Sequence, residues 1–221
     1  MIKPRICAVV TGSDMEAVRK AGGLADLFEV RIDLIGSKWQ EVASGLHKPW
    51  IAANRNPSNR GRYTGGEGQR IAELLTALDI GADIIDIEIE TPGLEEIAKK
   101  VKGKAKCLLS YHDWTGTAST EKLTAMVHRQ LAAGADICKV VTTATGLDDN
   151  LAIIRLPSLF PWANVIALAM GTAGALSRVL SPLAGGYLTY ASIGRGSASA
   201  PGQLSLEAMR SIYKTFHEYE S

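Results

Sequence analysis

The 221-residue sequence is poor in several features that mark specialised classes of protein. It has only three cysteines, Cys7, Cys107 and Cys138, and their spacing fits no zinc-binding pattern. Each lies in an apolar, strand-like run, so we interpret all three as small buried hydrophobic residues in a reducing compartment. The sequence therefore predicts no metal site and no disulfide framework.

The chain also lacks an excess of either charge. Its 24 basic and 23 acidic residues leave a net charge of +1, and the basic residues are scattered. This excludes a nucleic-acid footprint or a membrane-binding patch, so any anion binding must be local to a site. No segment approaches the roughly 20 apolar residues of a membrane span, and the N-terminus has no secretory pattern. We expect a cytoplasmic protein.

What is present is enough apolar material for one sizeable core. Hydrophobic residues make up 46% of the chain and charged residues 21%, which is ordinary for a globular protein. No stretch rich in Pro, Gly and Ser divides the sequence. We expect residues 1–221 to form a single domain.

Short, nearly continuous apolar runs recur along the chain, as in parallel strands that are covered on both faces. The expected strands are 5–10, 27–31, 50–54, 83–89, 106–112, 137–141, 165–170 and 187–192. Helical patterns lie between them, at 13–22, 67–82, 119–135, 146–160 and 201–219. Eight strands that alternate with helices favour an α/β fold of the (β/α)8 TIM-barrel type over an open doubly wound sheet.

In such a barrel the chemistry lies at the C-terminal ends of the strands. Polar residues stand at those ends in several of the expected strands. They are Glu29, Arg31, Asp33, Asn54, Arg55, Asp86, Glu88, Ser110, His112, Asp113, Lys139 and Ser192. A barrel without a functional site would not need so many charged residues at one end of its strands, although some of them could simply form ion pairs with one another.

Lys139 is the most unusual of these residues, because it interrupts the buried strand in "ADICKVV" (135–141). Removing an amine from water disfavours its charged form, and a neutral amine is what forms a Schiff base with a carbonyl substrate. Alternatively, the side chain could reach the barrel rim or pair with Asp86 or Glu88. Lys139 alone leaves the two interpretations equally open.

His112 favours the catalytic interpretation. It ends the neighbouring expected strand in "SYHDW" (110–114), and adjacent strands lie about 4.8 Å apart, so we expect it at the level of Lys139. An imidazole can both take and return a proton near neutral pH. The pair predicts covalent catalysis with proton transfer.

The chain resembles the type I 3-dehydroquinate dehydratases, the Schiff-base enzymes of the shikimate pathway, over essentially its whole length. The order and spacing of the matching motifs carry this resemblance. They are "FEVRIDL" (28–34), "NR" (54–55), "DIIDIE" (83–88), "SYHDW", "ADICKVV", "MGTAGALSRVL" (170–180) and "SASAPGQ" (197–203).

The resemblance implies a small anionic substrate, 3-dehydroquinate, and an activity that needs no cofactor. It implies that Lys139 forms the imine and that His112 is the general acid and base. The implied substrate-binding residues are Arg178, Ser199 and Gln203 for the carboxylate, with Glu29, Arg31 and Arg55 for the ring hydroxyls. It also suggests a homodimer.

The sequence departs from the family in two places. The first expected strand starts so early that we do not expect the N-terminal hairpin of longer members. After the third strand the family usually has an acidic residue before a Gly-Gly pair, whereas this chain has Asn59, Arg60 and Gly61. An amide can hydrogen-bond a hydroxyl but cannot act as an acid or base, and Glu67 is the acidic residue that could replace it.

Two rival functions remain open at this point. A Schiff-base class I aldolase would share the barrel and the lysine, and the glycines in 170–174 and 184–186 lie where barrels often bind phosphate. A binding module that takes up a small acid, with a structural Lys139, is the other.

Overall fold

Eight parallel strands form the centre of the molecule in the computed structural model, which describes residues 3–194, 196 and 198–218. Strand β1 pairs with β2 and β8, and the pairing continues in chain order from β2 to β7. One backbone hydrogen bond, from Tyr187 N to Val165 O at 2.8 Å, links the segment before β8 to β7. The strands are β1 Ile6–Val10, β2 Leu27–Arg31, β3 Trp50–Ala53, β4 Ile84–Glu88, β5 Lys106–His112, β6 Ile137–Thr143, β7 Asn164–Met170 and β8 Thr189–Ser192.

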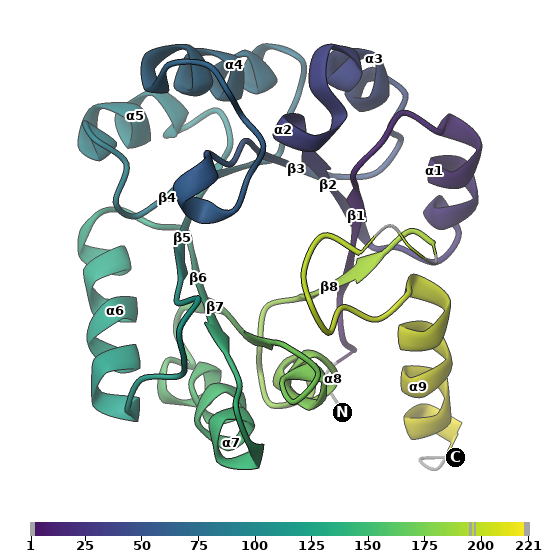
Figure 1. Cartoon of the computed structure of the whole chain (residues 1–221), viewed down its shortest axis with the longest axis vertical. Helices are drawn as coiled ribbons and strands as arrows, with labels where there is room; N and C mark the ends of the chain where they lie inside the picture. The colour runs from purple at the N-terminus through teal and green to yellow at the C-terminus, as the bar shows by residue number, and fades with distance from the viewer. Residues whose placement is uncertain (1–2, 195, 197, 219–221) are drawn as a thin grey trace.

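Helices surround this nearly closed barrel, which confirms the predicted TIM-barrel fold (Figure 1). The α-helices are α1 Met15–Gly22, α2 Ile32–Ile35, α3 Trp39–Ser44, α4 Glu67–Asp79, α5 Leu94–Val101, α6 Thr120–Ala132, α7 Leu147–Arg155, α8 Ala175–Leu183 and α9 Leu206–Glu218. Three short 3-10 helices are η1 Gly36–Lys38, η2 Pro57–Asn59 and η3 Pro157–Leu159.

All five expected helices are shorter than their sequence patterns, and the difference is largest for two of them. The pattern over 146–160 gives α7 only as far as Arg155, because Pro157 lacks the N–H that an α-helix would need and begins η3 instead. The pattern over 201–219 gives α9 only from Leu206, since residues 201–205 belong to the loop after β8. Residue 219 lies outside the described part of the chain.

Side chains inside the barrel change from apolar to charged along the strands. A buried apolar cluster inside the barrel consists of Cys7, Val9, Leu27, Ile51, Ile84, Leu108, Ile137, Ile166, Leu168, Leu188 and Tyr190. Side chains alternate across a strand, so the residue two positions further along points into the same interior. That step leads from Leu27 to Glu29, from Ile84 to Asp86 and from Ile137 to Lys139.

The three cysteines are buried and free, as the sequence predicted. Burial raises the pKa of the Cys107 and Cys138 thiols to about 12, which keeps them protonated and unreactive. None of the helices in the described residues is both long and apolar enough to cross a membrane.

Candidate active site

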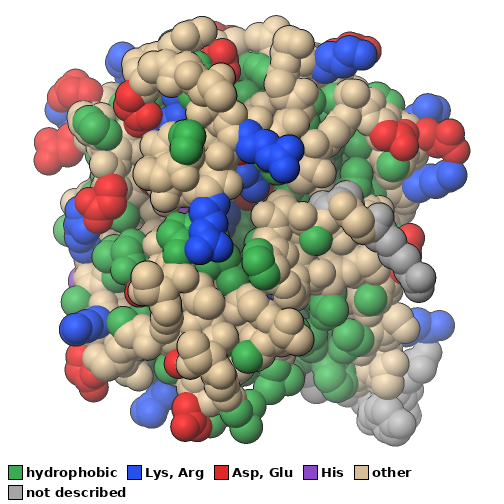
Figure 2. Space-filling view, viewed as in Figure 1, with side chains coloured by type: hydrophobic (Ala, Val, Ile, Leu, Met, Phe, Trp, Pro, Cys, Tyr) green, Lys and Arg blue, Asp and Glu red, His purple; other side chains and the backbone are tan. Residues whose placement is uncertain are grey.

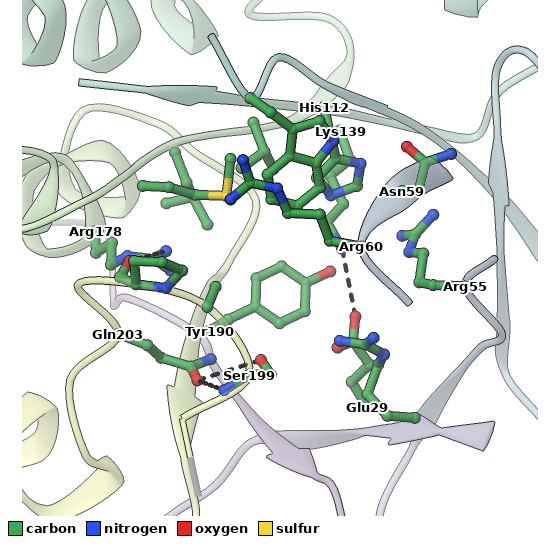
Figure 3. A pocket seen from close by; sticks show the side chains of 17 residues that line it. Glu29, Arg55, Asn59, Arg60, His112, Lys139, Arg178, Tyr190, Ser199 and Gln203 are labelled. Carbon is green, nitrogen blue, oxygen red and sulfur yellow. Dashed lines mark hydrogen bonds and ion pairs between the residues drawn. The ribbon is translucent and has the colours of Figure 1, made fainter. Parts of the chain in front are cut away.

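A cavity opens at the C-terminal end of the barrel. This end of the barrel faces the viewer in Figure 1. Each site residue predicted from the sequence lines it: Glu29, Arg31, Arg55, His112, Lys139, Arg178, Ser199 and Gln203 (Figure 3). Asn59 lines it too, from η2. The apolar part of the wall includes Leu168 and Met170 of β7 and Tyr190 of β8.

Lys139 lies at the base of this cavity and is 5% exposed. Its Nζ atom is 3.0 Å from Asp86 Oδ2 and 3.3 Å from Glu29 Oε1, and it lies 4.3 Å from the centroid of the Tyr190 ring. The pairing with Asp86 that the sequence left open is therefore present, whereas the second partner is Glu29 and not Glu88. These contacts hold the amine inside the cavity and away from the barrel rim.

His112 lies beside Lys139 in Figure 3, but not at its level on the neighbouring strand. The β5–β6 register sets Ser110 opposite Lys139 and His112 opposite Val141, two residues nearer the cavity mouth. The expectation of equal level was wrong, because β5 is offset from β6 by the twist and register of the barrel. The register therefore places the backbone of His112 two residues nearer the cavity mouth than that of Lys139.

The imidazole of His112 is held by stacking and by burial. It stacks on Trp114 with ring centroids 5.4 Å apart and planes 9° from parallel. Its Nδ1 atom is buried and has no hydrogen-bond partner among the described residues. Burial lowers the pKa of His112 well below its ordinary value, and the cations Arg55 and Lys139 lower it further. The ring is therefore neutral near pH 7 and can accept a proton.

A buried charge network supports Lys139 from β4. Asp86 accepts hydrogen bonds from Arg55 and from Ser110 Oγ, the latter at 2.6 Å. Burial alone would raise the pKa of Asp86, but Arg55 and Lys139 hold it well below its usual range. Asp86 therefore stays ionised and keeps both cations in place.

Arg70 of α4 extends this network behind the barrel wall, and the sequence analysis did not identify it. The side chain is 1% exposed, and its Nη1 atom donates to Glu88 Oε2 at 2.8 Å and to the Asn54 carbonyl. Glu88 in turn lies 3.3 Å from Arg55 Nη1. Arg70 also pairs with Glu67, which lies outside the cavity lining, so Glu67 does not replace the missing acidic residue at position 59.

Arg31 reaches the cavity from the end of β2. Its Nε and Nη2 atoms donate to the two carboxylate oxygens of Asp33 at 2.9 and 2.8 Å. This bidentate geometry fixes the plane of the guanidinium. The same Asp33 also accepts from the backbone N–H of Arg62 at 3.1 Å, which ties the loop after β3 to β2.

Arg178 enters the cavity from α8 and is buried, so it is not a surface arginine. Nη2 donates to the Pro201 carbonyl at 3.3 Å, and Nε has no partner in the described part of the chain. Burial lowers the pKa of Arg178 to about 10. A buried guanidinium with spare donors is suited to a carboxylate ligand.

Ser199 and Gln203 face Arg178 from the loop after β8. Gln203 Oε1 accepts from the backbone N–H of Ser199 at 2.7 Å and from its hydroxyl at 3.2 Å. This loop packs closely on the turn after β7: Gly202 has φ +75°, and a Cβ there would collide with the Gly171 carbonyl. Of the motif at 197–203, residue 197 lies outside the described residues.

The family follows from comparison with known sequences. The family described as type I 3-dehydroquinase matches residues 6–220, nearly the whole chain. The chain belongs to this family. A 3-dehydroquinate dehydratase of Dehalococcoides mccartyi is 43% identical over 213 residues, covering 96% of each chain. One from Methanocaldococcus jannaschii is 31% identical over 217 residues, covering 95% of this chain and 97% of the relative.

Solved structures of type I 3-dehydroquinases and their relatives have the same architecture. The crystal structure of 3-dehydroquinate dehydratase from Geobacillus kaustophilus superposes with a TM-score of 0.86 at 25% identity, covering 99% of this chain and 93% of that one. That from Aquifex aeolicus has a TM-score of 0.84 at 24% identity and shows the same fold.

The type I 3-dehydroquinase barrel brings further residues to the cavity that sequence reasoning missed. Trp114 and Tyr190 contact the two central residues, and Arg60 lines the mouth. Tyr190 could have been recognised from the sequence, because it lies two positions after the apolar Leu188 and so faces the same interior. In the described residues no group of three or more His, Cys, Asp or Glu side chains is placed to hold a metal ion.

Proposed function

We propose that this chain converts 3-dehydroquinate into 3-dehydroshikimate and water through an imine on Lys139. The observation that carries the proposal is that a buried amine, a neutral imidazole and a buried arginine line the same cavity. The family and the names of its relatives supply the substrate. They also favour dehydration over the carbon–carbon cleavage of a Schiff-base aldolase.

The first half of the reaction forms the electron sink. Nζ of Lys139, once it has lost its extra proton, adds to the substrate ketone, and water leaves as the C=N bond forms. The protonated imine withdraws electrons from the adjacent carbon and so acidifies its C–H bond. The carboxylates of Glu29 and Asp86 lie within 3.3 and 3.0 Å of Nζ and stabilise the positive charge that the imine carries.

His112 then acts first as a base and next as an acid. The neutral ring takes the proton from the carbon next to the imine, which leaves an enamine and an imidazolium. The enamine electrons return to form the new C=C bond as the β-hydroxyl departs, and the imidazolium protonates it to give water. Addition of water to the remaining imine releases the conjugated enone and restores Lys139. This order needs a ring that starts neutral, and the lowered pKa of His112 is consistent with that starting form.

The other cavity residues would position the substrate. Arg178 has the spare donors for the carboxylate, with Ser199 and Gln203 alongside it. Glu29, Arg31 and Arg55 face the interior where the ring hydroxyls would lie. Because Arg31 and Arg55 are already fixed by Asp33 and Asp86, substrate would meet donors that need little reorganisation.

The physiological setting follows from the same proposal. The reaction would serve the shikimate pathway, and with it chorismate and aromatic amino acid biosynthesis. No organic cofactor or metal enters the steps above, because the imine supplies the electron sink. A cytoplasmic location and a homodimer stay predictions, as does the lack of nucleic-acid and membrane partners.

Two measurements test the proposal. The first is the ultraviolet absorbance of the enone during incubation with 3-dehydroquinate, and a wild-type protein without this activity would refute it. The second is intact-protein mass after mixing with substrate and borohydride. We expect an adduct that maps to Lys139 in wild type and in His112→Ala, and none in Lys139→Ala.

The two variants also differ in rate. General acid–base assistance contributes about 10²–10⁴-fold, and one histidine here serves several steps, so His112→Ala should lose activity at or beyond the upper end. Lys139→Ala should be inactive although folded. Dehydration by Lys139→Ala at a near-normal rate would contradict the imine mechanism.

A further inference from the structure

The arginines of the cavity differ in whether a carboxylate already neutralises them. Arg31 is paired with Asp33, and Arg55 with Asp86. Arg60 and Arg178 have no ion pair with any residue that the structure describes. Figure 2 shows basic side chains near the middle of the face that carries the cavity, whereas the acidic side chains visible there lie toward its edge. The positive charges of the exposed Arg60 and of the buried Arg178 are therefore not compensated by a carboxylate among the described residues.

Arg60 has an unfavourable backbone conformation. It follows η2 with φ 52° and ψ 27°, and it is the single non-glycine residue with positive φ among those described. A long side chain costs free energy in this left-handed region, where glycine is comfortable. A glycine at position 60 would relieve this strain, so the presence of an arginine there points to a function for its side chain.

The surrounding turn holds Arg60 in that conformation. Its N–H donates to the Pro57 carbonyl at 3.0 Å, and the next N–H, of Gly61, donates to the Asn56 carbonyl at 2.8 Å. Gly61 has no space for a Cβ, because the Arg55 backbone lies against it. The turn therefore fixes the backbone position from which the Arg60 side chain extends.

From that point the side chain crosses the mouth of the cavity. The guanidinium carbon is 4.6 Å from the centroid of the Trp114 ring, and the other neighbour of that indole is His112. In Figure 3, Arg60 extends from the side of Asn59 across the view above Tyr190, toward the side where Arg178 lies. The residue is exposed, so stacking on Trp114 orients the cation without removing it from water.

We propose that Arg60 is a substrate-binding residue: a second cation, at the cavity mouth, that acts with Arg178 on the carboxylate of the substrate. The inference rests on the proposed function, which supplies an anionic substrate. Because Arg60 is exposed, it contributes to capture and affinity, whereas the chemical steps at Lys139 and His112 do not need it.

Three variants separate the charge from the fold. Arg60→Gln removes the charge, Arg60→Lys keeps it but loses the planar fork, and Arg60→Gly removes the side chain while relieving the backbone. The matched control is Arg62→Gln, an exposed arginine of the same loop that does not line this cavity and whose backbone N–H still bonds Asp33. KM and kcat for 3-dehydroquinate and the melting temperature are measured for each, at low and at high salt.

We expect Arg60→Gln to raise KM about ten-fold, the equivalent of one charge-assisted hydrogen bond of modest strength, with kcat nearly unchanged. Arg60→Lys should recover part of the loss, and Arg62→Gln should behave as wild type. The difference between Arg60→Gln and wild type should shrink at about 1 M salt, where the screening length falls to about 3 Å. Arg60→Gly should melt no lower than wild type and yet show the raised KM.

The results that would overturn the inference are distinct from those that would refute the function. An active wild type with an unchanged KM in Arg60→Gln and Arg60→Gly would refute the role of Arg60 alone. So would a fall in kcat at constant KM, which would mean an effect through Trp114 on His112. A wild type that does not act on 3-dehydroquinate would refute the proposed function and this inference with it.

Discussion

Replacing Asp86 by asparagine tests the charge network below the cavity. The carboxylate accepts from Arg55 and Ser110, and Lys139 Nζ lies 3.0 Å away, and all of these side chains are buried. Asparagine has the same shape and can keep an oxygen toward the cations, but it removes the negative charge. Two buried cations would then share only Glu29 and Glu88.

The expected loss of stability is large. Breaking a buried ion pair by removing one partner costs about 3–5 kcal/mol, because the remaining charge is left without compensation. For a chain of this length each kcal/mol lowers the melting temperature by about 2–4 °C. Asp86→Asn should therefore melt about 6–20 °C below wild type. Its rate on 3-dehydroquinate should fall too, since Lys139 and Arg55 lose the contact that orients them.

The matched control is Asp79→Asn, the same chemical change at the exposed end of α4. Surface substitutions of this kind usually change stability by no more than about 0.5 kcal/mol. Melting followed by circular dichroism at pH 7 compares the three proteins. An Asp86→Asn protein that melts within about 2 °C of wild type would mean that the network contributes little, and the reasoning would be wrong.

The pH dependence gives an independent check on the same carboxylate. The pKa of Asp86 is lowered in the folded protein, so its contribution to stability is fully present above the unfolded pKa of about 3.9. It is lost as the pH falls through the folded pKa, because the unfolded chain then binds the proton first. The difference in stability between wild type and Asp86→Asn should therefore be constant from pH 7 to about 5 and narrow below about pH 4.

Two further substitutions test the substrate-binding assignments. Arg178→Ala should raise KM tens-fold or more, because a hydrogen bond to a charged group contributes about 1.5–3 kcal/mol. Arg178→Lys should recover only part, and kinetics with unchanged KM and kcat in Arg178→Ala would reject the assignment. Asn59→Ala should reduce activity far less than His112→Ala, since an amide can only hydrogen-bond the substrate. If Asn59→Ala abolished turnover in a folded protein, the loop after β3 would have a catalytic role.

The strands could be predicted from the sequence to within two residues at each end. Each is a short apolar run bounded by polar or glycine positions, and both faces of a parallel barrel strand are buried. The agreement is least good for β8, which begins at Thr189 and not at 187, and for β6, which continues to Thr143. Boundaries of this kind depend on pairing with neighbouring strands, which a local pattern does not contain.

The helices were harder to predict, and α2, α3, α5 and α8 were not expected. They have between four and nine residues. Helices this short are marginal in isolation and form because the barrel covers one of their faces. Helix α8 even contains Pro182 in its last turn, a residue that argues against a helix when the sequence is read alone. Packing, and not local propensity, decides these elements.

The same distinction explains which site residues could be found. A charge inside an apolar strand, such as Lys139, is visible in the sequence because it violates the local pattern. Arg70 does not depart from its local sequence pattern, because it lies on an amphipathic helix, where arginine is ordinary. Its hydrogen bond to Glu88 depends on how the helix packs against the barrel, which the sequence alone does not show. Arg60 is a third case, because an arginine is ordinary in a loop, whereas its left-handed backbone conformation is not. The left-handed backbone that marks it becomes visible only once the turn after β3 has been folded.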